Sequence, residues 1–318
     1  MEQDKCAKCG EGFKQSDFNP NSKDMICEAC AKQLKKRDAL ATKLLLIAVF
    51  LTAIGLLWIF VGRPLIEQQQ ASKRIEEVAP ALSEMATQLS TDISQIIESA
   101  QALAMDLKNT ASDGGAVNQA GKQAVILKQQ AYNNSHPYVL YSYLGLTTKE
   151  MIISPEVELP PDYDPTSRPW YHQALVQTQP ELSDPYQDPT TFDWIVTLTV
   201  PLFKDEAMQQ LIGVSAADIK LNPLITPVIA SNEVIQNIQQ EAAASDAVQF
   251  TIATTKGIAI AHTTEILVGN VLTIPELVEA LAKEQSTTLD YTYLGDSYTA
   301  LIEKVEHSNL MAVVIIKR

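Results

Sequence analysis

The chain has 318 residues, of which 46% are hydrophobic and 19% are charged, and its formal net charge is −14. This is the composition of a folded protein rather than a disordered one, and the length allows two or three domains. Residues 1–63 hold ten Lys and Arg against seven Asp and Glu, whereas residues 64–318 hold fourteen against thirty-one. This acidic balance argues against nucleic-acid binding by the larger part, so no nucleic-acid partner is expected.

A cluster of cysteines opens the chain. Two Cys-x-x-Cys pairs stand seventeen residues apart, at Cys6, Cys9, Cys27 and Cys30. This spacing predicts one zinc ion held by four thiolates. Four protein ligands leave no open coordination position, so we expect structural Zn²⁺ in a cytoplasmic zinc ribbon over residues 1–38. The alternative interpretation is four reduced thiols without a metal.

An apolar segment follows at residues 44–62, LLLIAVFLTAIGLLWIFVG, which has no charge over nineteen residues. Its length predicts a single transmembrane helix. A buried core helix is the alternative, and a removable signal peptide is disfavoured because 43 residues precede the segment. Lys and Arg are concentrated before it, which predicts a single-pass plasma- or inner-membrane protein with a cytoplasmic N-terminus and a periplasmic or extracellular remainder.

A helical period continues through residues 65–108. Apolar residues recur every seven positions, at Ile75, Leu82, Leu89, Ile96 and Leu103. A second stripe drifts along the helix, which predicts a stalk helix that packs on its own globular domain, with a bend at Pro80. The stalk could also pair with a second copy in a homodimer, or it could have no twin.

Short strands and turns dominate the remainder and predict an α+β class. Alternating apolar segments predict strands at residues 137–146, 150–154, 193–203, 211–219, 248–262, 288–295, 296–305 and 310–318. Helices are predicted at RPWYHQAL, where Pro169 occupies the first turn, and at residues 232–244. Lys256-Gly257 is expected to form a hairpin turn.

Residues 65–318 resemble a double Cache sensor domain. The resemblance rests on four segments, which read RPWYHQA, VPLF, GVSAADI and TKGIAIAH…LVG. It implies a long N-terminal helix along which two PAS-like antiparallel-sheet modules stack. The membrane-distal module would cover residues 109–222 and the membrane-proximal module residues 230–318.

One subset of that family recognises amino acids through a Tyr, an Arg five positions later, a Trp-Tyr pair and a distant Asp. The matching positions in this chain are Tyr163, Arg168, Trp170, Tyr171 and Asp218. The resemblance implies that these five residues bind the ligand in the distal module. Further candidates for the side-chain end of the site are Tyr141, Tyr143, Asp184, Tyr186 and Asp188.

The five residue types suit the head of an α-amino acid, which carries one carboxylate and one ammonium. Arg168 offers a planar fork to the carboxylate, and Asp218 offers a counter-charge to the ammonium. The aromatic residues supply faces for cation–π contact and hydroxyls for hydrogen bonds. The alternative is structural: Arg168 could pair with Asp162 or Asp164, and the aromatic rings could be core anchors.

The expected function is a membrane-anchored sensor that binds an extracytoplasmic amino acid and signals to an unknown cytosolic partner through the zinc ribbon. Two alternatives stay open: an interaction or scaffold protein with a structural ectodomain, and a sensor of a simple amine for which Arg168 is idle. No nucleophile, carboxylate pair or open metal site is apparent, so an enzyme is not expected. Family members usually continue into a second span and an output domain, whereas this sequence stops at Arg318. We therefore expect any signal to travel through the stalk.

Overall fold

The computed structural model describes the following residues: 7, 9, 28–110, 118–177, 179–205, 207–242 and 247–318. The chain divides into two compact units, residues 1–69 and residues 70–318.

One helical run begins in the first unit and continues into the second. Helix α1 (Glu28–Leu57) continues through a π-helical turn, η2 (Trp58–Gly62), into α2 (Arg63–Lys108). Within the described residues this is the one helix long and apolar enough to cross a membrane, and its most apolar window has a mean hydropathy of 2.9 with no residue buried. The predicted span at residues 44–62 lies inside it. A core helix would be mostly buried, so its exposure favours a lipid-facing segment.

The first of two antiparallel sheets in residues 70–318 has the strand order β2-β1-β6-β5-β3, and β4 also pairs with β5. Its strands are β1 (Val139–Leu146), β2 (Met151–Ser154), β3 (Glu181–Leu182), β4 (Tyr186–Gln187), β5 (Trp194–Phe203) and β6 (Leu211–Lys220). Strands β1, β2, β5 and β6 were all predicted by their alternating apolar pattern, and these predictions are confirmed.

The second sheet has the order β8-β7-β11-β10-β9. Its strands are β7 (Val248–Thr254), β8 (Ala259–His262), β9 (Thr287–Tyr293), β10 (Asp296–Val305) and β11 (Leu310–Lys317). The predicted hairpin turn is confirmed between β7 and β8, where Gly257 has a φ of +79°. That left-handed conformation favours glycine over residues with a side chain.

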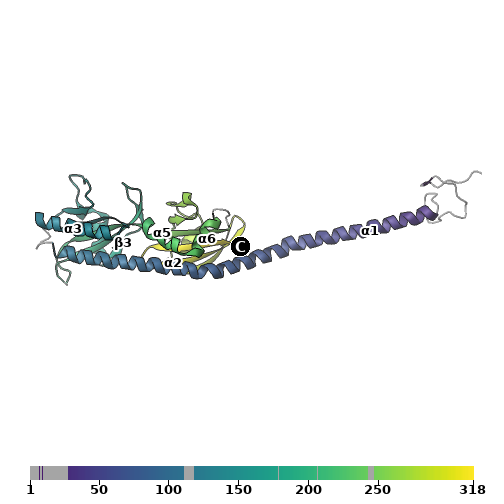
Figure 1. Cartoon of the computed structure of the whole chain (residues 1–318), viewed down its shortest axis with the longest axis horizontal. Helices are drawn as coiled ribbons and strands as arrows, with labels where there is room; N and C mark the ends of the chain where they lie inside the picture. Colours follow the sequence, from purple (N-terminus) through teal and green to yellow (C-terminus); the bar gives the residue numbers. More distant parts are fainter. Residues whose placement is uncertain are drawn as a thin grey trace, which may run out of the picture. The chain divides into compact units, whose positions relative to one another are not determined.

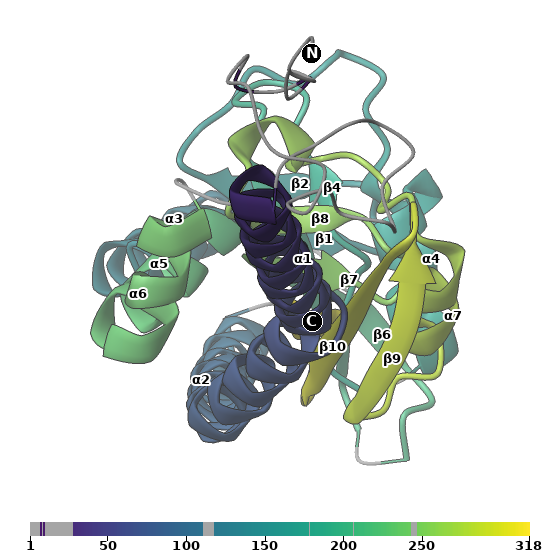
Figure 2. The same cartoon turned by 90° about the vertical axis from the view of Figure 1, so that its right-hand side faces the viewer.

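The helices of this unit lie on both sides of the sheets. They are α3 (Gln119–Ser135), α4 (Pro169–Gln177), α5 (Leu221–Ser231), α6 (Glu233–Ala242) and α7 (Pro275–Leu281). Figure 1 shows α2 running along both sheets. Figure 2 shows α3, α5 and α6 on the same side of the sheets as α2, with α4 and α7 on the opposite side.

The largest apolar core lies on the α2 side. It joins the buried stripe of α2 to α3, α5, α6 and one face of each sheet. Leu82 and Leu89 are fully buried in this core, and Ile96 is 3% exposed, as the heptad pattern predicts. Pro80 lies inside α2 without ending it. Two smaller apolar clusters lie on the other faces of the sheets, one under α4 and one under α7.

Three helices were not predicted from the sequence. Helix α3 is rich in Gln and Asn and begins with a glycine in its first turn, so its apolar period is weak. Helix α5 contains Pro223 and Pro227, which usually mark turns. Helix α7 has only seven residues, too few to show a helical period. In each case tertiary packing, rather than local pattern, stabilises the helix.

Removing one side chain from the α2 stripe tests this core. Leu89→Ala should lower the free energy of unfolding of residues 70–318 by about 2–5 kcal/mol, because it leaves a cavity among fully buried side chains. Urea denaturation followed by tryptophan fluorescence measures the change. Gln95→Ala, an exposed position on the same helix, is the control and should change the value by less than about 0.5 kcal/mol. Equal effects of the two substitutions would contradict the packing described here.

Candidate ligand-binding site

The five predicted site residues come from two parts of the first sheet's module. Tyr163, Arg168, Trp170 and Tyr171 lie in the segment between β2 and β3, around the short 3₁₀ helix η4 (Pro165–Ser167) and the start of α4, and Asp218 lies on β6. The segment is held by an Asx turn, in which Asp164 Oδ1 accepts hydrogen bonds from the Thr166 backbone N–H at 2.9 Å and from its hydroxyl at 2.6 Å. Pro169 then begins α4.

Strand register decides which side of the sheet carries Asp218. It pairs with Tyr141 on β1 and with Thr197 on β5. Directly paired residues point to the same face of a sheet, and so do residues two apart on one strand. Tyr143 therefore shares this face. The neighbouring Ala217 and Ile219 point the other way, into the core with α2, so the polar group lies on the side that α4 covers.

Asp218 is the centre of a buried hydrogen-bond network. Its Oδ1 accepts hydrogen bonds from Tyr143 Oη at 2.9 Å and from Thr197 Oγ1 at 2.8 Å. Tyr186 Oη lies 2.7 Å from Thr197 Oγ1 and extends the network. The residue is only 8% exposed, and in the described part of the chain no Lys, Arg or His forms an ion pair with it. Burial raises the pKa of Asp218 to about 6, although the two hydrogen bonds act in the opposite direction.

An aromatic wall stands beside this network. The rings of Tyr143 and Trp170 meet edge to face with centroids 5.0 Å apart, and those of Trp170 and Tyr171 with centroids 5.5 Å apart. Trp170 can lie this close to β1 because residue 145 is a glycine: a Cβ at that position would lie only 2.7 Å from Trp170 Cη2. Tyr171 is buried, and within the described residues its hydroxyl has no hydrogen-bond partner.

Arg168 does not behave as a structural ion-pair partner. Its Cζ lies 4.3 Å from the centroid of the Tyr163 ring, a cation–π contact. Its Nε is buried, and no group in the described residues accepts a hydrogen bond from it. Asp164 pairs instead with Lys149 at 2.8 Å, and this partner, together with the hydrogen bonds from Thr166, lowers the pKa of Asp164 to about 2. Among the described residues Arg168 forms no ion pair with Asp162 or Asp164, so the structure gives no support to the structural alternative for this side chain.

The five candidates for the side-chain end separate into different environments. Tyr143 and Tyr186 belong to the Asp218 network, and the pKa of Tyr141 is raised by burial and then by the charges of Asp188 and Asp218. Asp188 is buried and accepts hydrogen bonds from the backbone N–H groups of Thr190 and Thr191, which fixes its own turn. Asp184 bonds instead to the second sheet's module, through Lys256 Nζ at 2.5 Å and Asn309 Nδ2 at 2.8 Å.

The sequence analysis missed Thr197, which holds both Asp218 and Tyr186. A polar residue that interrupts the apolar run of a strand was the available signal, because Thr197 and Thr199 alternate with apolar residues in WIVTLTV. That signal says only that one face differs from the other. It does not identify the partner on the neighbouring strand.

The predicted zinc site is not tested by this structure. Cys6 and Cys27 lie outside the described residues, whereas Cys9 and Cys30 lie within them. Among the residues that are described, no group of three or more His, Cys, Asp or Glu could hold a metal ion. The four-thiolate site therefore stays a prediction.

Residues 114–226 match the family described as "Methyl-accepting chemotaxis protein-like, first PDC sensor domain". Over this segment the chain is similar to a chemoreceptor-like PDC sensor domain of the Cache type. It is 40% identical over 88 residues to the methyl-accepting chemotaxis protein McpC of Bacillus subtilis, covering 27% of this chain and 13% of that protein. It is 33% identical over 119 residues to McpA of Pseudomonas putida, covering 37% of this chain and 18% of that protein. These relatives are sensors rather than enzymes, and the matched segments span less than a fifth of their length.

Solved structures resemble the fold over a larger part of the chain. The ligand-binding domain of the Campylobacter jejuni chemoreceptor Tlp3, in complex with L-norvaline, aligns with a TM-score of 0.59 and 18% identity over 80% of this chain and 94% of that one. The ligand-binding domain of the Pseudomonas aeruginosa amino-acid chemoreceptor PctB, in complex with L-Arg, aligns with a TM-score of 0.53 and 21% identity over 77% and 95%. At these identities the likeness establishes the shared fold: a long helix followed by two antiparallel sheets.

Replacing the buried carboxylate tests the electrostatics of the site. The native pKa of Asp218, about 6, lies above its ordinary value of 3.8, so the native state binds this proton more tightly than the unfolded state does. The resulting stabilisation is fully present below pH 3.8 and is lost as the pH rises through about 6. Asp218→Asn should therefore raise the free energy of unfolding of ligand-free protein at pH 7.5 by about 1–3 kcal/mol.

The same substitution should have little effect near pH 4, where the wild-type carboxyl is mostly protonated in the native state. Urea denaturation of exhaustively dialysed protein at both pH values measures the difference. An equal loss of stability at the two pH values would show that the charge of Asp218 costs nothing in the native state.

Proposed function

We propose that the chain is a membrane-anchored receptor that binds an extracytoplasmic amino acid in the module of the first sheet. The observation that carries this proposal is the state of Asp218: a carboxylate that is 8% exposed and has no cationic partner in the described residues. Burying a charge without a partner is costly, and proteins usually avoid it by pairing. The ammonium of a ligand supplies the missing partner.

The other residues of the motif complement the rest of an amino-acid head. Arg168 has no ion-pair partner in the described residues, and its planar guanidinium suits the two oxygens of a carboxylate. Tyr163, Trp170 and Tyr171 provide aromatic faces against a desolvated cation. The hydroxyl of Tyr171, which has no hydrogen-bond partner in the part of the chain that is described, adds a hydrogen-bonding group. That structural neighbours of this fold were solved with L-norvaline and L-Arg supports the same ligand class.

The remaining parts of the proposal concern the membrane and the cytosol. The apolar helix anchors the chain, with the N-terminus in the cytoplasm because basic residues precede the span. A zinc ribbon formed by Cys6, Cys9, Cys27 and Cys30 contacts a cytosolic protein partner, and two copies of the stalk helix associate as a homodimer. A ligand changes such an assembly only through different affinities for its two states.

Two other functions are compatible with parts of the site. A simple amine would need Asp218 and the aromatic rings but not Arg168. A structural ectodomain would need neither charge, and the ribbon alone would carry the interaction with a partner.

Calorimetry with the full chain in lipid nanodiscs tests the amino-acid proposal. We expect at least one of the twenty common L-amino acids to bind, and Arg168→Ala to weaken that binding more than about thirtyfold, because it leaves a ligand carboxylate desolvated and unpaired. Affinity should also fall as the pH drops below about 6, because protonation of Asp218 removes the counter-charge.

Lys149→Ala is the matched control, since Lys149 is an exposed cation of the same module that pairs with Asp164. It should leave the affinity unchanged. Binding that survives Arg168→Ala indicates an amine ligand. No binding of any amino acid to folded protein would exclude the receptor proposal and favour the structural ectodomain.

The zinc ribbon has its own test. Purified full-length protein should contain about one zinc ion per chain by elemental analysis, and Cys9→Ser should lose most of it, because three thiolates hold the ion far less tightly than four. Amino-acid binding by the variant should persist, since the cysteines lie in the other unit of the chain. A wild-type protein free of zinc after purification without chelators would rule out the ribbon.

A further inference from the structure

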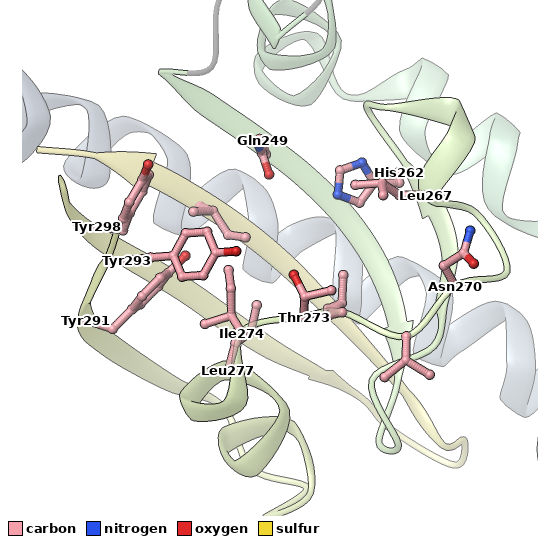
Figure 3. Close-up of a pocket in the computed structure, with 13 residues that line it drawn as sticks. Gln249, His262, Leu267, Asn270, Thr273, Ile274, Leu277, Tyr291, Tyr293 and Tyr298 are labelled. Atoms are coloured by element: carbon pink, nitrogen blue, oxygen red, sulfur yellow. The ribbon is translucent and has the colours of Figure 1, made fainter. Parts of the chain in front are cut away.

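The second sheet carries a cavity that the amino-acid proposal does not use. It has a volume of about 310 Å³ and lies between the sheet and the segment that leads into α7. Figure 3 shows its walls: tyrosines from β9 and β10, Gln249 from β7, His262 at the end of β8, and the residues that lead into α7. A cavity of this size falls within the range of small-molecule sites.

The cavity lies on the same face of the second sheet as the Asp218 network does on the first. The two sheets share a topology. In each, the second strand along the chain pairs with the first, the first with the last, and the last with the one before it, which gives β2-β1-β6-β5 in the first sheet and β8-β7-β11-β10 in the second. On β11 and β7, Ile315 and Gln249 are paired and point to the cavity side, whereas Val314 and Phe250 point into the core with α2. The cavity thus lies on the face away from α2, as the Asp218 network does in the first module.

The lining differs chemically from that of the first site. None of the thirteen residues around the cavity is Asp, Glu, Lys or Arg. The apolar part of the wall comes from Leu267, Val271, Leu272, Ile274, Leu277 and Ile315, and the polar part from Gln249, His262, Asn270, Thr273, Tyr291, Tyr293 and Tyr298. Lys317 Nζ lies 6.0 Å from the centroid of the lining Tyr298 ring, but it already pairs with Asp296. A charged ligand would lose its hydration without a counter-charge from the lining itself, so the lining favours an uncharged one.

Three tyrosines form an aromatic end to the cavity. Tyr291 and Tyr298 stack with ring centroids 5.4 Å apart and planes 15° apart. Burial raises the pKa of Tyr291 to about 12, so its hydroxyl stays protonated and can donate a hydrogen bond. Figure 3 shows the Tyr293 hydroxyl directed into the cavity. Aromatic faces beside hydroxyl groups suit a planar ring with polar substituents.

His262 supplies a hydrogen-bond donor on the other side. Its Nδ1 accepts the backbone N–H of Thr264 at 2.8 Å, and burial lowers its pKa, which favours the neutral imidazole. In that tautomer the proton is on Nε2, which can donate to a carbonyl oxygen or a ring nitrogen. The amide of Gln249 can both donate and accept.

We propose that this cavity is a second ligand site, which takes a small uncharged heteroaromatic molecule with the polarity of a pyrimidine base or a pyridine amide. Its ring lies against the tyrosines and its acceptor atoms face His262 and Gln249. The site is independent of the amino-acid site, because the two lie on different sheets and share no residue.

Calorimetry on the full chain in nanodiscs, with nicotinamide and uracil as probes, tests this site. At least one of the two should bind with a dissociation constant below about 1 mM. Nicotinate has the ring of nicotinamide but carries a carboxylate, and it should bind at least tenfold more weakly than nicotinamide. Equal affinity for nicotinate and nicotinamide would contradict an uncharged site.

Two variants leave the core intact and locate the binding. Tyr293 is 37% exposed and Thr273 is also exposed, so Tyr293→Ala and Thr273→Phe should fold normally; the first removes an aromatic face and the second fills the space. Each should weaken binding at least tenfold. Thr292→Ala, next to Tyr293 on β9 but on the opposite face, is the control and should leave affinity unchanged.

Arg168→Ala separates this proposal from the proposed function. It should weaken amino-acid binding more than about thirtyfold and leave nicotinamide or uracil binding unchanged. The second site is ruled out if neither probe binds folded protein, or if Tyr293→Ala and Thr273→Phe both bind like the wild type. It is also ruled out if the probes lose affinity in Arg168→Ala but not in Tyr293→Ala, since they would then occupy the first module.

Discussion

The packing of α2 against one face of each sheet is the constraint on which the rest of this structure depends. A single apolar stripe, which includes Leu82, Leu89 and Ile96, contributes to one continuous core with both modules. Because side chains on a strand alternate between faces, committing one face of each sheet to this core leaves the other face free. The shorter helices α4 and α7 cover those faces only in part, and both proposed sites lie there.

The two free faces have opposite electrostatic characters. In the first module Asp218 is a buried carboxylate beside the aromatic wall, and the Arg168 guanidinium, which lies over the Tyr163 ring, has no ion-pair partner among the described residues, at a cost to the stability of the ligand-free protein. Such a site gains most from a ligand that brings both missing charges. In the second module the lining holds no formal charge, and tyrosines and a neutral imidazole set its preference. One topology, used twice, thus presents two kinds of recognition surface.

The modules are also joined by direct polar contacts. Asp184 of the first module accepts hydrogen bonds from Lys256 and Asn309 of the second. Asp184 and Lys256 are 50% and 68% exposed, so their ion pair adds little free energy. The common core is the stronger connection, and it means that a change in the packing of α2 is felt by both modules.

The local pattern of apolar residues in the sequence was enough to predict many of the helices and strands of this protein. The apolar run at residues 44–62, the helical period of α2 and the alternation in β1, β5, β6 and β11 all predicted their elements, because periodic burial leaves a direct trace in the sequence. Helices α3, α5 and α7 left no such trace.

At the proposed site, the motif of Tyr, Arg, Trp-Tyr and distant Asp selected Arg168 and Asp218 from the sequence. It could not show that Asp164 pairs with Lys149 or that Thr197 donates a hydrogen bond to the buried carboxylate. Those facts depend on strand register and on which side chains meet across the sheet, and only the tertiary structure fixes them. The cavity beside His262 is of the same kind: its residues are scattered from Gln249 to Ile315, and only folding brings them to one face.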